Sequence, residues 1–369
     1  MRAVATDGRG GLEVLDIPRP RPEEHGALLK VDACGFCGSD LDKVRDQALP
    51  AGRVLGHEVV GHLLEDGSLG HRVAVAHHVP CGRCPRCRSG HSSLCRQFVS
   101  SDLDPGGLSE FIAVSRVHLD NAVFALPERI GDLEGTLVEP ISCVLRALDT
   151  AAGLLGAYPL PGVLGAGAPD GGHGGGPGEW RGAETAVFGG GGSGRTGELE
   201  QKDVLVAGCG SVGLLFLSLL RAAAHLSAAG PVHPSRLFYL EPDPERARLA
   251  ESLGARPWSP EQPVEVAFLT APPAFPQLVA ALPEGAVLLV FAAGAEEVPL
   301  PLERLYRREL VIAGVRSGSP QHLRRAVEIL GSGRLDLSWF RPLEVDFADL
   351  PAAVESYARG DVLKVVARP

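Results

Sequence analysis

The chain has no excess of basic residues and no apolar run long enough to cross a membrane. Its formal net charge is -10 at pH 7, which disfavours a nucleic-acid-binding surface, because contact with phosphate backbones needs a surplus of Lys and Arg. The longest apolar stretches, around 212–220 and 286–293, are interrupted or too short to span a bilayer. The N-terminus lacks a charged segment followed by an apolar one. We therefore expect a cytoplasmic protein that binds neither nucleic acid nor membrane.

The chain also lacks the cysteine pattern of a disulfide-rich secreted domain. Four of its eight cysteines fall in one short segment, and the others lie in separate segments without a framework pattern. This distribution indicates a reducing compartment. The scattered cysteines are Cys34, Cys37, Cys143 and Cys209.

The clustered cysteines have the spacing C-x2-C-x2-C-x7-C, which is the most informative feature of the sequence. Four thiolates in one tetrahedral shell suit a structural zinc ion, because sulfur is a preferred ligand and a closed shell leaves no position for a substrate. Buried thiols or two disulfides are weaker alternatives, since a small apolar core does not place four cysteines among Gly, Pro and Arg. A zinc-ribbon nucleic-acid module is disfavoured by the acidic charge and by the lack of base-stacking aromatics in the segment. The predicted ligands are Cys81, Cys84, Cys87 and Cys95.

The length of 369 residues favours two domains over one core. The first 140 residues predict an irregular β-rich domain, with strands at 26–33, 54–64 and 72–76. A helix is predicted from Pro140, because proline is tolerated in a first turn and the apolar residues that follow share one face. These apolar residues are Ile141, Val144, Leu145 and Leu148.

A glycine-rich segment at 153–197 interrupts the chain. It holds 18 glycines among 45 residues, so it cannot bury enough surface to offset its ordering entropy. We interpret it as a flexible surface loop inserted in the second domain. The Gly165-Ala166-Gly167 motif inside it resembles a phosphate loop, but no apolar helix follows it.

The second half of the chain alternates apolar strands with helical stretches. A strand at 204–207 precedes a glycine-rich turn and a helix at 214–226, and further strands are predicted at 237–240, 264–270, 287–291 and 310–315. Such alternation is typical of a parallel α/β sheet with helices on both faces.

The turn between the first of these strands and its helix has the dinucleotide-binding pattern GxGxxG. Its glycines let backbone amides approach a pyrophosphate, which the helix N-terminus attracts. Glu241, at the end of the next strand, is the expected acceptor for the adenosine ribose hydroxyls, and its charge would repel a 2′-phosphate, so NAD is favoured over NADP. Glu241 could instead be a turn residue, and Asp243 is more simply the N-cap of the next helix. Arg246, one helical turn later, could weaken the preference for NAD over NADP. The predicted turn residues are Gly208, Gly210, Ser211, Val212 and Gly213, and the long spacing to Glu241 fits a loop at 227–235.

A second set of metal-ligand types is scattered over the first domain. Cys37 lies in a CxxC pair with Cys34, but the surroundings are not those of a thioredoxin-like redox site. His57 and Glu58 are adjacent, and Glu139 precedes a proline. One Cys, one His and carboxylates from distant segments describe an open catalytic zinc site, although each residue alone would be unremarkable.

These segments together resemble the zinc-dependent medium-chain alcohol dehydrogenases over nearly the whole chain, except for the glycine-rich segment. The Glu-Pro pair at 139–140 resembles the sorbitol, threonine and butanediol dehydrogenase branch. The segments that carry the resemblance are CGSD at 37–40, GHE at 56–58, the four cysteines, EP at 139–140, GxGxxG at 208–213 and LKVV at 363–366.

The resemblance implies roles for the residues of the zinc site. Cys37 and His57 would be zinc ligands. Glu58 would be a ligand or would exchange with water at the zinc ion. Glu139 would be a ligand or would hold the water molecule bound to zinc. Ser39 matches the proton-relay hydroxyl of the family. Two further residues complete the implied site: Asp40 matches the carboxylate behind the ligands, and Asp42 stands where a relay histidine is common.

The resemblance also implies the fold and the activity. We expect a Rossmann cofactor domain (146–316) and a GroES-like catalytic domain formed by 1–145 and 317–369. The implied reaction moves a hydride between a secondary alcohol or polyol and NAD, with two zinc ions per chain, in a homodimer or homotetramer. A ketone or aldehyde reductase using NADPH and a catalytically inactive binding protein are the alternatives.

Overall fold

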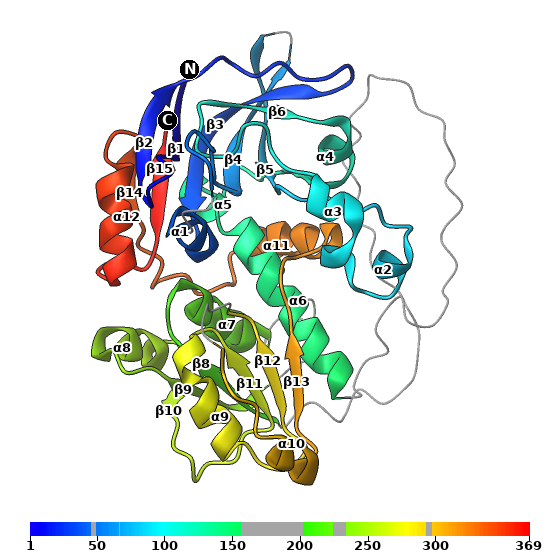
Figure 1. The fold of residues 1–369 in the computed structure, drawn as a ribbon, viewed down its shortest axis with the longest axis vertical. Helices are drawn as coiled ribbons and strands as arrows, with labels where there is room; N and C mark the ends of the chain where they lie inside the picture. The colour runs from blue at the N-terminus through cyan, green and yellow to red at the C-terminus, as the bar shows by residue number, and fades with distance from the viewer. Residues whose placement is uncertain (46–48, 66, 156–201, 224–233, 293–296) are drawn as a thin grey trace.

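The computed structural model describes residues 1–45, 49–65, 67–155, 202–223, 234–292 and 297–369. These residues form two lobes, each built around a β-sheet (Figure 1). The upper lobe in that view contains both ends of the chain, and the lower lobe contains the parallel sheet. None of the described helices combines the length and the apolar character that a membrane crossing needs.

The sheet of the upper lobe has seven strands in the order β14-β15-β3-β4-β5-β7, with β6 also paired to β3. β15 runs antiparallel to β3 and places Val365 opposite Phe36. A segment near the end of the chain therefore lies beside the strand that leads to Cys37. The strands are β3 (Ala27–Phe36), β4 (Glu58–Glu65), β5 (Ser68–Val75), β6 (Phe111–Val114), β7 (Val123–Ala125), β14 (Leu343–Asp346) and β15 (Val365–Arg368), with β1 (Arg2–Thr6) and β2 (Leu12–Asp16) as a separate antiparallel pair.

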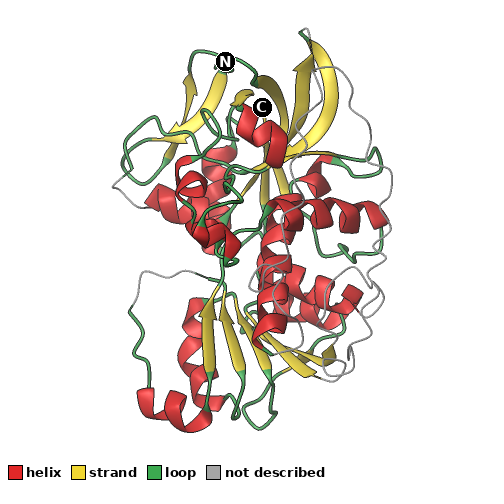
Figure 2. Ribbon diagram, turned by 90° about the vertical axis from the view of Figure 1, so that its right-hand side faces the viewer, coloured by secondary structure: helices red, strands yellow, loops and turns green. Residues whose placement is uncertain are grey.

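The sheet of the lower lobe has six strands in the order β10-β9-β8-β11-β12-β13, and every neighbouring pair is parallel. Helices lie on both sides of this sheet (Figure 2). The prediction of a Rossmann domain next to a GroES-like domain is thereby confirmed. The strands are β8 (Lys202–Ala207), β9 (Pro234–Leu240), β10 (Arg256–Pro257), β11 (Val266–Leu269), β12 (Val287–Val290) and β13 (Val311–Gly314).

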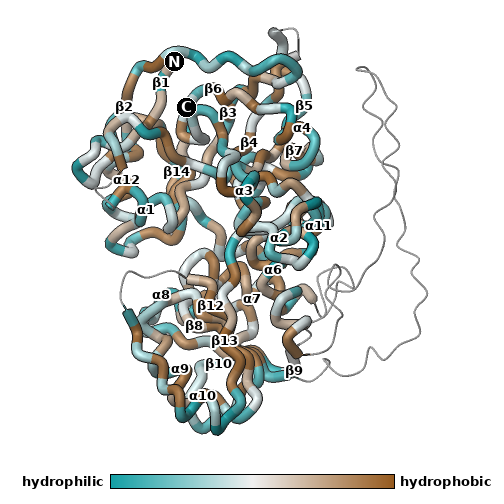
Figure 3. The backbone as a smooth tube through the Cα atoms, turned by 45° about the vertical axis from the view of Figure 1, so that its right-hand side comes forward, coloured by the Kyte–Doolittle hydropathy of each residue, from teal (hydrophilic) through white to brown (hydrophobic). Residues whose placement is uncertain are grey.

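The apolar runs of the parallel strands arise because both faces of the sheet are covered. Val204 and Val206 of β8 pack in one core with α6 (Val138–Leu154) and α7 (Ser211–Ala223). Leu205 and Ala207 pack in another core with α9 (Phe275–Ala281). Successive side chains of a strand point to opposite faces, so a strand buried on both faces needs continuous apolar sequence. Figure 3 shows these hydrophobic strands gathered in the lower lobe.

The helices connect and cover the two sheets. The upper lobe contains α1 (Gly38–Arg45), α2 (Pro85–Arg88), η1 (Ser92–Leu94), α3 (Arg96–Ser100), α4 (Arg116–Asn121), α5 (Asp132–Gly135) and α12 (Leu350–Arg359). The remaining helices are α6 (Val138–Leu154), α7 (Ser211–Ala223), α8 (Pro244–Ser252), η2 (Pro272–Ala274), α9 (Phe275–Ala281), α10 (Leu302–Arg308) and α11 (Pro320–Ser332).

Helix α6 carries Glu139 in its first turn, and Pro140 lies in that turn as predicted. The four apolar residues expected on one face are 0–1% exposed, so that prediction is confirmed. The helix begins two residues before Pro140 and is continuous across residues 145 and 146, where the predicted domain boundary falls.

Strand β4 begins later than the predicted strand at 54–64. Gly56 has φ +92°, and a Cβ atom there would lie 2.8 Å from both Cys34 Sγ and the backbone nitrogen of Leu108. This left-handed turn prevents the extended backbone from starting at Val54, which only forms an isolated bridge with Ala5. The turn directs His57 and Glu58 toward the end of β3.

The glycine-rich prediction is only partly testable. Gly153 and Leu154 belong to the last turn of α6, and they are therefore not part of a loop. Residues 156–197 lie outside the described residues, as does the Gly165-Gly167 motif. The loop predicted at 227–235 also lies outside them, except that Pro234 and Ser235 begin β9.

Candidate zinc and dinucleotide sites

The four clustered cysteines lie on a small lobe made by α2, η1, α3 and the loop before them. Their sulfur atoms all lie within 4.8 Å of one another. Cys84 Sγ is 3.6 Å from Cys87 Sγ, and Cys81 Sγ is 4.0 Å from Cys87 Sγ. Four sulfurs at about 2.3 Å from a tetrahedral zinc would be about 3.8 Å apart, whereas a disulfide needs about 2.05 Å. The spacing therefore fits zinc and does not fit disulfide bonds.

Backbone N–H groups lower the pKa of Cys81 and Cys95, whereas burial and the neighbouring thiols raise the pKa of Cys87 to about 12. The backbone nitrogens of Cys81 and Cys84 donate to Cys95 Sγ and Cys81 Sγ, both at 3.4 Å. Burial raises the pKa of Cys95, but backbone donors from Cys81 and Phe98 outweigh it and lower the pKa to about 6. Thiolates are the form that binds zinc, so this lobe is suited to hold the ion.

A second group of metal-ligand types forms where β3 ends and β4 begins. Ligand atoms of Cys37, His57 and Glu58 lie within 4.8 Å of one another. Gly35 pairs with Glu58 across the two strands, and a Cβ atom at Gly35 would lie only 2.0 Å from Glu58 Oε2. Glycine at this position is therefore required for the carboxylate to reach the group.

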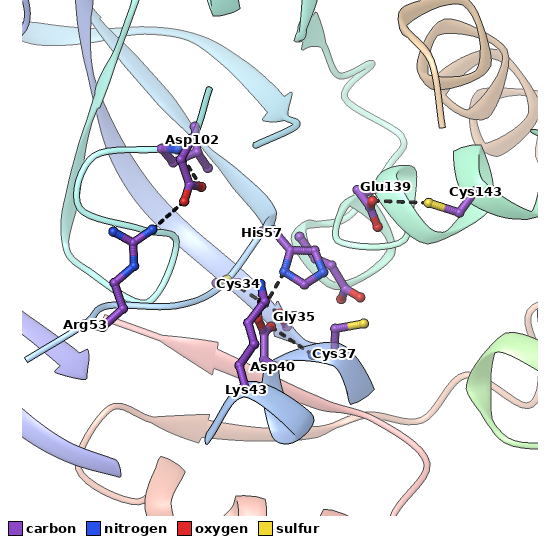
Figure 4. Close-up of polar contacts among 12 residues, drawn as sticks. Cys34, Gly35, Cys37, Asp40, Lys43, Arg53, His57, Asp102, Glu139 and Cys143 are labelled. Atoms are coloured by element: carbon purple, nitrogen blue, oxygen red, sulfur yellow. Dashed lines mark hydrogen bonds and ion pairs between the residues drawn. The ribbon is translucent and has the colours of Figure 1, made fainter. Parts of the chain in front are cut away.

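Asp40 holds the ring of His57. Asp40 Oδ1 is 3.1 Å from His57 Nδ1, and Asp40 Oδ2 accepts a hydrogen bond from the backbone nitrogen of Cys37 at 3.3 Å. Burial lowers the pKa of His57 and raises that of Asp40, but their mutual attraction dominates and reverses both shifts. With Nδ1 directed to Asp40, Nε2 is the nitrogen available to a metal ion. Figure 4 shows Cys37, Asp40 and His57 close together.

Glu58 is paired with Lys364, which directly precedes β15. Lys364 Nζ lies 2.6 Å from Oε1 and 2.5 Å from Oε2 of Glu58, and both side chains are almost fully buried. Only the contact with Oε1 has hydrogen-bond geometry, so Oε2 is a buried oxygen without a hydrogen-bond partner. Burial lowers the pKa of Lys364, but Glu58 and Cys37 outweigh it and raise the pKa. Glu58 still contributes a carboxylate beside the thiol of Cys37 and the imidazole of His57, and these are ligand types that zinc binds.

Glu139 does not join this group among the described residues. Its Oε1 accepts a hydrogen bond from Cys143 Sγ at 3.2 Å, one turn later on α6 (Figure 4). Burial raises the pKa of Glu139. The structure thus brings together three of the four predicted ligands, with the fourth turned toward Cys143.

The predicted relay residues lie on α1. Ser39 and Asp42 are both exposed, whereas Asp40 between them is buried against His57. Ser39 is two residues from Cys37, at the start of the helix. Their roles in proton transfer stay predictions.

Two residues near the site were not identified from the sequence. Cys143 was noted only as a scattered cysteine, and its contact with Glu139 follows from the helical spacing of four residues. His77 follows β5, and its ring is tilted by 38° against that of His57, with ring centroids 4.6 Å apart. The adjacent histidines at 77 and 78, directly after a predicted buried strand, are a signal that could have indicated His77.

The dinucleotide-binding pattern lies between β8 and α7, as predicted. Gly208 has φ +99°, and a Cβ atom at Gly213 would lie 1.9 Å from Gly208 O, so glycine is needed at both positions. A Cβ atom at Gly210 would contact nothing within 4 Å. Open space at the N-terminus of α7 fits a pyrophosphate group. Ser211 and Val212 begin that helix.

Glu241 directly follows β9 and points back to the glycine turn. Its Oε2 accepts a hydrogen bond from the backbone nitrogen of Cys209 at 2.6 Å, and its Oε1 accepts one from that of Asp243 at 3.0 Å. Asp243 caps α8, as its sequence position indicated. Arg246 donates from Nη2 to Gly360 O at 3.0 Å, which joins α8 to the end of α12.

Comparison with known proteins agrees with this geometry. Residues 23–127 match the alcohol dehydrogenase GroES-like domain. An uncharacterized zinc-type alcohol dehydrogenase-like protein of Haemophilus influenzae is 28% identical over 179 residues, which cover 46% of this chain and 50% of that protein. The L-threonine 3-dehydrogenase of Yersinia pestis is 28% identical over 153 residues, covering 38% of this chain and 43% of the enzyme. The chain thus spans half or less of the curated relatives it matches.

Similarity to solved structures extends over the full chain. The alcohol dehydrogenase of Thermus sp. ATN1 superposes with a TM-score of 0.75 at 20% identity, covering 100% of both chains. At this identity the superposition establishes the fold. Taken with the domain match and the zinc-type relatives, it shows that the chain is similar to the zinc-dependent medium-chain alcohol dehydrogenases, as the sequence indicated.

Proposed function

We propose that this chain is a zinc-dependent oxidoreductase that transfers a hydride between a secondary alcohol or polyol and NAD. The observation that carries the proposal is the convergence of Cys37, His57 and Glu58 within 4.8 Å, in a chain that also has a GxGxxG turn on a parallel sheet. A metal site with a free position and a dinucleotide site are the two components that this reaction needs.

Cys37, His57 and Glu58 would hold the catalytic zinc, with Glu139 as a fourth ligand or as the residue that orients a water molecule. When bound, the ion supplies Lewis-acid chemistry that lowers the pKa of a hydroxyl group. Asp40 keeps the Nε2 of His57 available to the ion. Lys364 balances the charge of Glu58 in its buried position.

The proton released by the alcohol needs a route to solvent. Ser39 is the hydroxyl nearest to Cys37 in sequence, and its exposure supports a role in passing the proton outward. Asp42 is exposed on the same helix and would act as an outer acceptor.

The cofactor preference follows from Glu241. Two backbone N–H groups fix its carboxylate beside the glycine turn, where it would accept hydrogen bonds from the adenosine ribose and repel a 2′-phosphate. Arg246, on the helix that follows Glu241, already donates to Gly360 O, which reduces its availability to a phosphate. Both observations support NAD over NADP.

We assign the four-cysteine lobe to a second, structural zinc.

We expect the enzyme to be a homodimer or homotetramer. β13 pairs only with β12 among the described strands, so it leaves one sheet edge open. The large apolar side chains Leu302 and Tyr306 of α10 are 73% and 85% exposed. An open edge with exposed apolar residues nearby supports association with a second copy.

A panel of secondary alcohols and polyols, assayed for NAD reduction at 340 nm, tests the proposed function. We expect turnover that requires bound zinc, and loss of turnover in Cys37→Ser with the fold retained. A zinc-loaded wild-type protein that oxidises no member of the panel and reduces no matching ketone would contradict the proposal.

A further inference from the structure

Arg146 is a partly buried cation of α6 that the proposed reaction does not yet use. Its guanidinium donates hydrogen bonds to three backbone carbonyl oxygens in two other parts of the chain. Nη1 lies 3.0 Å from Arg316 O and 3.1 Å from Ser317 O, and Nη2 lies 3.0 Å from Gly90 O. One side chain therefore joins α6 to the four-cysteine lobe and to the segment that follows β13.

Residues 315–319 connect β13 of the parallel sheet to α11 (Figure 1). Within this segment Ser317 has φ +60°, a left-handed conformation that is costly outside glycine and that often occurs at binding sites. The carbonyl groups of Arg316 and Ser317 flank the α-carbon of Ser317, and Arg146 Nη1 donates to both of them. Arg146 thus holds the two peptide groups that set the conformation of Ser317.

The segment 315–319 lies at the carboxyl end of β13, on the opposite side of β8 from Glu241. Dinucleotides bind across the carboxyl ends of parallel strands, with the pyrophosphate at the turn after the first strand. In the strand order β10-β9-β8-β11-β12-β13, Glu241 follows β9 and residues 315–319 follow β13. With the pyrophosphate at the turn after β8 and the adenosine ribose beside Glu241, the nicotinamide half would extend toward β13.

The four-cysteine lobe is linked to the same segment by a second arginine. Arg316 Nη2 donates to Ser93 O of η1 at 3.0 Å. The segment also lies against α6, since a Cβ atom at Gly318 would lie only 2.1 Å from Ser142 Oγ. The segment is therefore held by α6 and by the lobe together.

We propose that Arg146 is a positioning residue for the nicotinamide half of the cofactor, because it fixes the backbone of Arg316 and Ser317 beside that half of the site. This inference rests on the proposed function and adds a task for the four-cysteine lobe, whose Gly90 carbonyl orients the guanidinium. Arg146 acts through the backbone that it holds. The glycine turn and Glu241, which would bind the adenosine half, should not depend on it.

The test compares two ligands that fill different lengths of the dinucleotide site. NADH is the whole cofactor, whereas ADP-ribose lacks the nicotinamide ring. Isothermal titration calorimetry on the zinc-loaded protein measures the Kd of each ligand. Arg146→Met should raise the Kd of NADH on the order of 10-fold, because the Kd rises as the binding conformation becomes less populated. The Kd of ADP-ribose should change less than about 3-fold.

Two further variants provide the controls. Arg116→Met removes an arginine of α4 whose side chain is 63% exposed, and it should leave both Kd values unchanged. Arg146→Lys keeps the positive charge but replaces the planar fork by a single nitrogen, so its Kd for NADH should lie between those of the wild type and Arg146→Met. Zinc content and Tm of each variant are measured alongside. Should Arg146→Met fail to fold, Arg146→Lys takes its place in the comparison.

Hydrogen–deuterium exchange of the cofactor-free protein provides a readout of the backbone itself. In Arg146→Met, peptides that cover 315–319 should exchange faster than in the wild type, because their backbone has lost its hydrogen-bond donor. Peptides that cover 208–213 should exchange at the wild-type rate. A general loss of packing would accelerate exchange in both segments.

The possible outcomes separate the two proposals. Equal rises in the Kd of NADH and ADP-ribose, or an unchanged Kd of NADH, overturn the role of Arg146 and leave the proposed function intact. A wild type that binds NADH but neither oxidises an alcohol of the panel nor reduces a matching ketone overturns the proposed function. The two Kd values then still decide the role of Arg146.

Discussion

Lys364 and Glu58 form a buried ion pair across 306 residues of sequence, with Nζ 2.6 Å from Oε1. The pairing of β15 with β3 brings the two residues together, because Val365 lies opposite Phe36. A candidate metal ligand thus has its counter-charge supplied by a distant segment.

Removing that counter-charge should destabilise the protein. In zinc-free protein, Lys364→Met leaves Glu58 buried without a cation, which typically costs about 3–5 kcal/mol. Urea denaturation measures the loss of unfolding free energy. The control is Arg307→Met, whose pair with Glu303 is exposed and contributes about 1 kcal/mol or less. Equal effects of the two substitutions would show that the Lys364 pair contributes no more than a surface pair.

The zinc content should be two ions per chain, each held by a separate group of residues. Cys84→Ser should lose one equivalent and much stability, because the four-cysteine lobe depends on its metal. Cys37→Ser should lose the other equivalent and the activity, with the fold retained. Elemental analysis of chelator-free protein measures both, and a wild type with a single equivalent would contradict this assignment.

The cofactor preference should weaken when Glu241 is replaced. Glu241→Ser removes the charge opposed to a 2′-phosphate, so the NAD/NADP ratio of kcat/KM should fall on the order of tenfold. Glu245→Ser is a matched control, since that side chain lies four residues later, in the first turn of α8, and is 83% exposed. A wild type that prefers NADP would remove Glu241 from this role.

The proton route should depend more on Ser39 than on Asp42. Ser39→Ala should reduce kcat by about 100-fold or more, because it removes a positioned proton-transfer group. Asp42→Asn should cost less, and Glu139→Gln should fall between them or be worse, because it also weakens the metal site. Steady-state kcat of the three variants gives the order. Equal losses for Ser39→Ala and Asp42→Asn would assign the relay to the carboxylate.

Asp149, which links α6 to α11, should contribute to the free energy of unfolding in a pH-dependent way. His322 Nε2 lies 3.1 Å from Asp149 Oδ2, and Arg325 Nη1 lies 2.6 Å from the same oxygen. Burial raises the pKa of Asp149, but these two contacts outweigh burial and lower the pKa. A depressed pKa in the folded state means that the stabilisation is present above the unfolded pKa of about 3.9 and is lost as the pH falls through the folded value.

The expected result is a difference between wild type and Asp149→Asn on the order of 1 kcal/mol at pH 6, because the pair is partly exposed. This difference should shrink below about pH 4. Urea denaturation from pH 7 to pH 3 measures it, with Glu303→Gln as the exposed control. A difference that does not change with pH would show that Asp149 acts through packing alone.

The sequence allowed the fold and the local motifs to be predicted, because these depend on short-range patterns. The parallel strands, α6 and the GxGxxG turn each have a period or spacing that their own residues determine. The ligand group was predicted from the types of Cys37, His57 and Glu58, but their meeting depends on the pairing of β3 with β4. The Lys364 pair and the contact of His77 with His57 depend on contacts between separate segments of the chain. No single segment records such contacts, so they could not be predicted.

The pairing of β15 with β3 also affects when the upper sheet can form during synthesis. β3 and β4 leave the ribosome about 300 residues before β15, so the edge of β3 that β15 will occupy stays open while the whole parallel domain is made. Domains commonly fold in order of synthesis, and the parallel domain can therefore close before the upper lobe is complete. An exposed strand edge in a half-made chain invites pairing with other strands. The sheet that contains the candidate metal ligands is thus completed only when the last strand of the chain has been made.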